Sequence, residues 1–300
     1  MSFSNLDLVR QCDTFSTSEG AYEFRYREFL LGYVCKKVAG ALHELPKGWW
    51  KVEKNHIRFA DEADTSMERR CEVIRMTVDT WRIRKRFKVL EKWRDELYSV
   101  YAPSHTVLFT IERAASPLFG VATFGVHMIA FTTNPLMLWV PKRAQNKTHG
   151  GKYDNTVAGG IAHGYNVLDT LVKESEEEAG FHESLIRSKA CPVGAVSYHY
   201  IRGEQAGGET GLYQPEYEYV YDLELDKSVI PKPNDDEVDH FELWSVNQVK
   251  ENLRQGSFKT NCALVTIDFF IRHGIINADN EPDYIEIQQR CHRDMPFPVM

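Results

Sequence analysis

The stretch that decides the fold is residues 158–181, AGGIAHGYNVLDTLVKESEEEAGF, in which a glycine loop leads into one helix. Asn166 is a preferred N-cap residue, and Gly180 suits the left-handed position that ends many helices. At 100° per residue, the apolar side chains between these caps fall on one arc of the helix. Glu174 and Glu178 border that arc, one turn apart. The sequence therefore predicts a half-buried helix with carboxylates at the edge of its buried face.

The glutamates near the end of this helix carry charge that needs a counterion. Like charges four residues apart destabilise a helix, and acidic residues late in a helix oppose its dipole. Taken alone, an acidic run such as residues 176–178 is most often a solvated surface. The glycine loop, the two caps and the placement beside the apolar arc favour a site instead. Oxygen ligands on a rigid helix suit Mg²⁺, which takes one or two carboxylates and shares phosphate oxygens with its substrate.

The same stretch resembles the Nudix box, the family signature G-x5-E-x7-R-E-U-x-E-E-x-G-U, in which U is an aliphatic residue. The positions that match are Gly159, Glu174, Glu177, Glu178 and Gly180, and Phe181 fits the last apolar position loosely.

Three positions depart from the signature. Lys173 keeps the positive charge of the box arginine but not its planar, two-pronged guanidinium. Tyr165 replaces the early glutamate, and Ser175 replaces the aliphatic residue. In the family, the early glutamate more often holds the loop and helix together than binds metal. Its loss therefore concerns the support of the loop more than metal binding.

Further segments extend the resemblance over most of the chain. They are residues 112–115, 118–121, 125–127, 138–140 and 154–160 before the box, and 194–198, 221–225, 237–239 and 269–274 after it. In that order they are similar to a Nudix subfamily related to the N-terminal part of fungal thiamine pyrophosphokinase, with plant relatives. The resemblance implies an α/β (α+β) fold, the Nudix α/β/α sandwich with a mixed sheet. It also implies a smaller N-terminal α+β extension over residues 1–115, the Nudix domain over 116–280 and a C-terminal tail over 281–300.

The resemblance assigns roles within the site. Nudix enzymes hydrolyse a diphosphate linked to another group, and Mg²⁺ is the implied cofactor, with Mn²⁺ as an alternative. Glu174, Glu177 and Glu178 would hold the metal together with the backbone carbonyl of Ala158. The catalytic candidates are Glu177, Glu178 and Glu237, and the general base is open between Glu178 and Glu237. Residues 235–237 could equally form an acidic turn.

The candidates for substrate binding are Arg143, Lys152, Gly159, Gly160, His127 and Tyr198. Arg143 is expected to contact a phosphate, whereas Lys152 and the other cations between residues 142 and 152 could belong to a solvated loop. His127 lies in an apolar run and is more typical of a hydrogen-bonded core histidine. Tyr198 offers a ring for an aromatic substrate, although such aromatic residues are more often core.

Composition limits the partners. The chain has 300 residues and a formal net charge of −7, with the acidic excess after residue 110. Nucleic acids and anionic membranes are polyanions, so we expect neither as a partner. A small diphosphate remains compatible when a divalent cation neutralises the carboxylates. The first residues do not resemble a secretory signal and the six cysteines form no paired motif, so we expect a cytoplasmic protein with reduced thiols.

Three functions remain open. The subfamily implies hydrolysis of thiamine diphosphate, or of oxidised or damaged analogues such as oxythiamine and oxothiamine diphosphate, to the monophosphate and phosphate. A Nudix hydrolase could instead act on another substrate such as ADP-ribose, and a catalytically silent binding module is the third function. The oligomeric state is also open, a homodimer included. The N-terminal extension could shape the pocket, cover the sheet or mediate dimerisation.

Patterns elsewhere predict further elements. Apolar residues from Met67 to Trp81 recur at helical spacing, and Thr65 with Glu68 would form a capping box at the start. The basic segment 81–88 is either a phosphate contact or, more often in such a protein, a solvated helix face. Strands are predicted at residues 127–131, 136–140, 194–200 and 217–225, and a buried helix over 264–273 that ends at Gly274.

Overall fold

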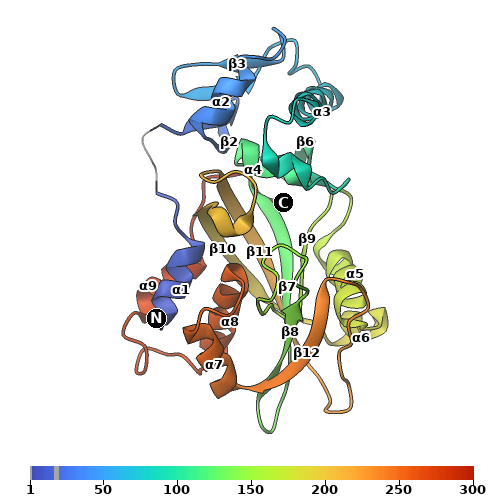
Figure 1. The fold of residues 1–300 in the computed structure, drawn as a ribbon, viewed down its shortest axis with the longest axis vertical. Helices are drawn as coiled ribbons and strands as arrows, with labels where there is room; N and C mark the ends of the chain where they lie inside the picture. The colour runs from blue at the N-terminus through green and yellow to red at the C-terminus, as the bar shows by residue number, and fades with distance from the viewer. Residues whose placement is uncertain (1, 17–19) are drawn as a thin grey trace.

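The computed structural model describes residues 2–16 and 20–300, and within them the chain is organised around a mixed six-stranded sheet (Figure 1). The strands run in the order β10-β11-β7-β8-β12, and β9 pairs with β7. β11 lies parallel to β7, whereas the neighbours β10, β8, β9 and β12 pair in antiparallel fashion. The strands are β7 (Thr123–Thr132), β8 (Met137–Arg143), β9 (Val157–Gly160), β10 (Cys191–Ile201), β11 (Tyr213–Glu224) and β12 (Val238–Ser245).

β7 is buried along its whole length because helices cover both faces of the sheet. Successive side chains of a strand point to opposite faces. Val126 and Met128 accordingly join one apolar layer, while Ile129 and Phe131 join the other. A strand covered on both faces reads as a continuous apolar run, which is the pattern of this segment.

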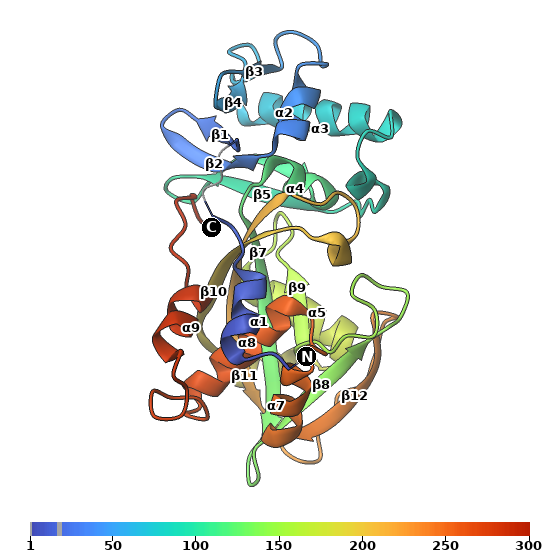
Figure 2. The ribbon, with the colours of Figure 1, turned by 60° about the vertical axis from the view of Figure 1, so that its left-hand side comes forward.

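The helices form the two outer layers (Figures 1 and 2). α5 (Val167–Ala179) and α6 (Glu183–Lys189) pack on one face of the sheet. The opposite face carries α1 (Asn5–Cys12), α7 (Val246–Arg254), α8 (Thr260–Arg272) and α9 (Tyr284–Cys291). The predicted α/β/α arrangement with a mixed sheet is confirmed. Among the described helices, none has the length and hydrophobicity needed to cross a membrane.

Residues 22–120 form a second layer at one end of the sheet, which we call the N-terminal module (Figure 2). Its four-stranded sheet has the order β2-β1-β4-β3, and β5 and β6 form a separate hairpin. The strands are β1 (Tyr22–Tyr26), β2 (Phe29–Val34), β3 (Trp50–Val52), β4 (His56–Phe59), β5 (Leu97–Ala102) and β6 (Thr106–Glu112). The helices are α2 (Lys36–Leu42), α3 (Met67–Ile83) and α4 (Ser116–Phe119), with 3-10 turns at Lys88–Glu91 and Arg113–Ala115.

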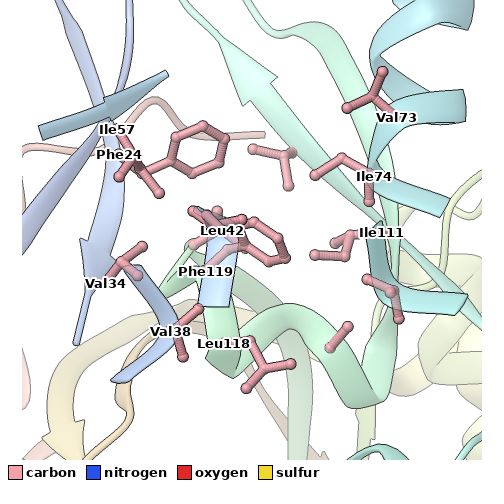
Figure 3. Packing of buried hydrophobic residues seen from close by; sticks show 14 of the residues in the cluster. Phe24, Val34, Val38, Leu42, Ile57, Val73, Ile74, Ile111, Leu118 and Phe119 are labelled. Atoms are coloured by element: carbon pink, nitrogen blue, oxygen red, sulfur yellow. The ribbon is translucent and has the colours of Figure 1, made fainter. Parts of the chain in front are cut away.

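One apolar core holds the N-terminal module together (Figure 3). Val73 and Ile74 of α3 lie on one side of it, and Phe24 and Ile57 of the sheet lie on the other. Phe119 of α4 sits between them and is fully buried. Because α4 leads directly into β7, this core also fixes where the central strand of the large sheet begins.

The two ends of the chain share the other core. α1 packs on α8 and α9 through Leu6, Val9 and Cys12, and Figure 1 shows it beside these helices. The segment predicted as a tail contributes Ile287 of α9 to the same core, and its Phe297 is buried in the layer around α5. The first 115 residues are therefore divided between two cores, and the limits of the domains stay a prediction.

The local predictions hold with shifted ends. α3 is present, but its N-cap is Ser66, whose hydroxyl accepts a hydrogen bond from the backbone N–H of Arg69. The predicted capping box at Thr65 was therefore wrong by one residue. The basic segment that follows is a solvated helix end, where Arg86 pairs with Glu44 at 2.7 Å. The four predicted strands are β7, β8, β10 and β11, and the helix before Gly274 is α8, which starts earlier, at Thr260.

Candidate active site

The glycine loop and α5 form the frame of the site. Asn166 caps α5 by accepting a hydrogen bond from the backbone N–H of Asp169 at 2.8 Å, and Gly180 takes the left-handed conformation after the last turn. Both predicted caps are confirmed. Leu171 and Val172 are buried against the sheet, which fixes the rotation of the helix. That rotation turns the box glutamates towards β9, the strand that ends in the glycine loop.

Glu178 is the most deeply buried of these glutamates. Glu178 is only 6% exposed, and its Oε2 accepts a hydrogen bond from the backbone N–H of Ala158 at 2.8 Å. Burial raises the pKa of Glu178 well above its usual range, and the nearby carboxylate of Asp154 adds to this rise, partly offset by the Ala158 N–H. The protein alone therefore disfavours the ionised form of Glu178, which a bound cation would stabilise.

Glu174 lies against the glycine loop. A Cβ atom on Gly159 would overlap the Glu174 carboxylate, so only glycine permits this close approach. Lys173 Nζ lies 3.0 Å from Glu174 Oε1 and 2.7 Å from Glu177 Oε2. Glu177 is largely solvated, with 48% of its side chain exposed. The lysine that replaces the box arginine thus links two of the three predicted metal ligands.

Glu174, Glu177 and Glu178 line the same cavity, but their carboxylates do not converge on one metal position. Among the residues that the structure describes, no three acidic, histidine or cysteine side chains are gathered closely enough to form a ready metal site. Glu178 is bonded to Ala158, and Glu177 is bonded to Lys173. The donors nevertheless fit a hard divalent cation, because they are all oxygens and the carboxylates among them would be neutralised by it. Glu174, Glu178, the Ala158 carbonyl and, once released from Lys173, Glu177 would hold such an ion.

A cavity of about 920 Å³ opens in front of these residues. Its walls come from the glycine loop, α5, β11 and the N-terminal module. The predicted site residues that line it are Glu174, Glu177, Glu178, Ala158, Gly159, Gly160, Arg143, His127 and Glu237. The structure therefore brings most of the predicted set together in one place.

Two predicted substrate contacts need correction. Tyr198 is fully buried and does not line the cavity. Its hydroxyl instead lies 2.7 Å from Glu216 Oε2 and 2.9 Å from Glu218 Oε1. Lys152 also lies outside the cavity, because its Nζ donates a hydrogen bond to the carbonyl of Gly256 at 2.6 Å. Tyr198 holds residues that reach the cavity, and Lys152 secures a loop.

Arg143 and His127 line the cavity, and their polar groups already make hydrogen bonds within the protein. Arg143 Nη1 lies 2.6 Å from Asp154 Oδ2, and its Nε donates to the carbonyl of Thr148 at 3.1 Å. His127 Nδ1 lies 2.7 Å from the side-chain oxygen of Asn155. Burial lowers the pKa of His127 to about 4, so the ring is neutral near pH 7. His127 is thus the hydrogen-bonded core histidine that the sequence favoured, with one edge at the cavity.

Glu216 and Glu218 are cavity residues that the sequence reasoning missed. Both line the cavity from β11, and the Glu218 carboxylate lies so close to Gly125 that a Cβ there would overlap it. Burial raises the pKa of Glu218 to about 8, and the neighbouring negative charge of Glu216 contributes. The strand alternation does separate Glu218 from the tyrosines of β11. It does not reveal that the glutamate face lines a cavity.

Lys259 is a second missed residue, at the start of α8. It lines the cavity, and within the described part of the chain its ammonium group makes no hydrogen bond or ion pair. Burial disfavours its charged form, but Asp154 and further acidic groups such as Glu216 together outweigh burial and raise the pKa of Lys259. The cavity therefore holds a charged lysine that is free to bind an anion. An isolated lysine in a sequence carries no signal that would have identified it.

Comparisons with known proteins agree with this geometry. Residues 122–263 match the family model described as NUDIX domain, and residues 4–123 match one described as a domain of unknown function, DUF4743. An uncharacterized protein of Saccharomyces cerevisiae is 36% identical over 283 residues, which are 91% of this chain and 82% of that protein. The chloroplastic Nudix hydrolases 20 and 24 of Arabidopsis thaliana are 41% and 40% identical over 203 residues, 66% of this chain. The chain matches about half of the length of these two plant relatives, 52% and 53%.

Proposed function

Residues 122–263 match the NUDIX domain model, and on that premise we propose that the chain is a Nudix hydrolase that acts on thiamine diphosphate or its oxidised or damaged analogues. The NUDIX match supports a diphosphate hydrolase that uses a divalent metal, and we propose Mg²⁺ as that metal. The products would be the monophosphate and inorganic phosphate. One observation carries the reaction: buried carboxylates on α5 contact the glycine loop in the wall of a cavity that Lys259 also lines.

The residues of the cavity divide the work by charge. Glu174, Glu178 and the Ala158 carbonyl would hold the metal. When bound, a divalent ion neutralises phosphate oxygens and lowers the pKa of a coordinated water. Lys259 would bind a phosphate oxygen directly, since within the described chain its ammonium group makes no hydrogen bond or ion pair. An anionic substrate can therefore enter a site rich in carboxylates.

The general base remains a proposal, and the structure adds a candidate to it. Glu237 lies 3.5 Å from Lys147 Nζ and 3.7 Å from Arg143 Nη2, so its carboxylate is already paired with two cations. Burial raises the pKa values of Glu178 and Glu218, and that of Glu218 rises to about 8, near the working pH at which a base is most effective. We therefore favour Glu178 or Glu218 over Glu237.

The substrate assignment is supported by the aromatic and acidic residues that line the cavity. Tyr98, Phe124 and Tyr200 line it together with the carboxylates of Glu216 and Glu218. A positively charged aromatic ring is stabilised both by aromatic faces and by carboxylates. A thiamine group has this chemistry.

A second candidate substrate, ADP-ribose, is favoured by the basic residues that line the cavity. Lys92, Arg94 and Arg202 also line the cavity, and these donors suit a substrate with additional ribose oxygens, such as ADP-ribose. The two candidates differ in the group beyond the diphosphate, so a direct comparison separates them.

A substrate panel tests the proposal. The full chain is assayed with Mg²⁺ against thiamine diphosphate, oxythiamine diphosphate and ADP-ribose at several concentrations. We expect the highest kcat/KM for a thiamine-type diphosphate, with release of inorganic phosphate. A higher kcat/KM for ADP-ribose would overturn the substrate assignment, and no hydrolysis of any diphosphate would overturn the proposed reaction.

The substitution Lys259→Met tests the anion contact. Methionine keeps most of the length of the side chain and removes its charge, so we expect KM for the diphosphate to rise about tenfold, a loss of about 1.4 kcal/mol. Lys54→Met removes the same charge from an exposed loop outside the cavity and should leave KM unchanged. Steady-state kinetics at fixed Mg²⁺ measure both. An unchanged KM in Lys259→Met would contradict the role given to this lysine.

A further inference from the structure

The glycine loop lacks the support that the family signature provides. Tyr165 stands where the signature has its early glutamate, and this tyrosine is 47% exposed. An exposed aromatic ring cannot tie the loop to α5 as a buried carboxylate would. The loop nevertheless must be fixed, because Ala158 and Gly159 at its start contact Glu178 and Glu174.

We propose that the N-terminal module completes the catalytic site, with Ser99 of β5 and His163 of the glycine loop as positioning residues. The proposal rests on the proposed function, since it concerns the same metal and diphosphate site. It assigns a role to the segment whose matching model is described as a domain of unknown function.

Three successive residues of β5 contact the loop. The backbone N–H of His163 donates a hydrogen bond to the carbonyl of Leu97 at 2.7 Å. Its ring Nδ1 lies 2.8 Å from Ser99 Oγ. The hydroxyl of Tyr98 fills the space beside Gly160 so closely that a Cβ there would overlap it. Since β5 is paired with β6 and Tyr98 is buried, these contacts come from a rigid element.

The same module also brings a cation to the site. Arg113 follows β6 and lines the cavity, with its Nη1 2.8 Å from Glu96 Oε2 and its guanidinium 5.5 Å from the centre of the Tyr98 ring. Burial raises the pKa of Glu174, and the positive charge of Arg113 is one of the influences that oppose this rise. The module thus supports the loop and adds positive charge beside a proposed metal ligand.

A second contact joins the N-terminal module to the large sheet, through the loop between β10 and β11. Glu209, in the loop between β10 and β11, is buried, and its two carboxylate oxygens accept hydrogen bonds from the backbone N–H groups of Lys88 and Val89, each at 2.8 Å. That loop also lines the cavity through Arg202 and Glu204. The module is therefore held against the cavity on two sides, one of which is the glycine loop.

The inference predicts a specific effect of Ser99→Ala. The backbone bond from His163 to Leu97 survives this substitution, so the fold should persist while the ring of His163 loses its partner. We expect faster hydrogen exchange in residues 159–166 of the metal-free full chain and about fivefold weaker Mn²⁺ binding by calorimetry, as the loss of one hydrogen bond implies. In the enzyme assay we expect kcat to fall, with KM for the diphosphate nearly unchanged.

Two further variants make the test specific. The single substitution His163→Asn, with Ser99 unchanged, places a polar atom near the position of Nδ1. It should keep loop protection and Mn²⁺ affinity close to the wild-type values. Ser197→Ala removes a comparable hydrogen bond, from Ser197 Oγ to the carbonyl of Arg293 at 2.7 Å, and should change neither. Equal effects of Ser99→Ala and Ser197→Ala, or no effect of Ser99→Ala on exchange and Mn²⁺ affinity, would overturn the inference.

The readouts separate this inference from the proposed function. Hydrogen exchange and Mn²⁺ binding are measured without substrate. If the wild-type chain hydrolysed no diphosphate while Ser99→Ala loosened the loop and weakened Mn²⁺ binding, the reaction would be overturned and the positioning role supported.

Discussion

Glu178→Gln is expected to reduce diphosphate hydrolysis about 1000-fold, which corresponds to about 4 kcal/mol of transition-state stabilisation. Glutamine has nearly the same shape and can still accept the hydrogen bond from the Ala158 N–H. It lacks the negative charge that a divalent cation requires. The loss should therefore appear as weakened metal binding and lowered kcat rather than as misfolding.

The same substitution should stabilise the metal-free protein. The pKa of Glu178 is raised in the folded state, mainly by burial, so wild-type stability falls as pH rises from the unfolded pKa through the folded one. Glutamine does not ionise and escapes this loss. At pH 7 with a chelator we expect Tm of the variant to exceed that of the wild type by roughly 2–4 °C, and the two to converge near pH 4. Thermal unfolding at both pH values measures this.

Glu176→Gln is the matched control for both measurements. Glu176 lies two residues away on the same helix, is exposed, and does not line the cavity. It should keep wild-type activity and stability. Full activity in Glu178→Gln, or an equal loss in Glu176→Gln, would contradict the assignment of the site to the buried edge of α5.

Gly159→Ala is expected to reduce hydrolysis at least 100-fold, or about 3 kcal/mol, with little loss of stability. The added Cβ would overlap the Glu174 carboxylate, and that carboxylate is the end of a side chain that can rotate away. The fold therefore survives, while a proposed metal ligand is displaced from the glycine loop. Kinetics and calorimetric Mn²⁺ titration on the same preparation measure both consequences.

Gly40→Ala provides the matching control. Gly40 lies in α2 with no atom near the position that a Cβ would occupy, and alanine is the better helix former. We expect wild-type activity and a gain in stability of about 0.5–1 kcal/mol. Retention of Mn²⁺ affinity in Gly159→Ala would show that the contact between the loop and Glu174 is not needed.

The features that the sequence predicted well are those governed by local rules. The caps at Asn166 and Gly180 and the rotation of α5 follow from residues within one helix, and the structure confirms them. The strand at residues 127–131 was predicted from its apolar run, and the structure confirms it as part of β7. The Nudix box adds the identity of the site because its residues are close together in the sequence.

The features that it could not predict depend on contacts between distant segments. Ser99 and His163 are 64 residues apart in the sequence. No local pattern therefore predicts that their contact would support the loop in place of the missing box glutamate. Whether Glu218 faces solvent or a cavity depends on what covers β11. Tyr198 and Lys152 were misplaced for the same reason: residue type suggested a ligand contact, but their partners lie within the protein.

The measurement that tests the central claim most directly is hydrolysis of a thiamine-type diphosphate by the wild-type chain in ¹⁸O-labelled water. The account predicts cleavage that requires Mg²⁺ or Mn²⁺, incorporates one ¹⁸O atom per bond broken and stops when a chelator is added. Cleavage that continued with chelator, or the absence of any cleaved product with either metal, would contradict it.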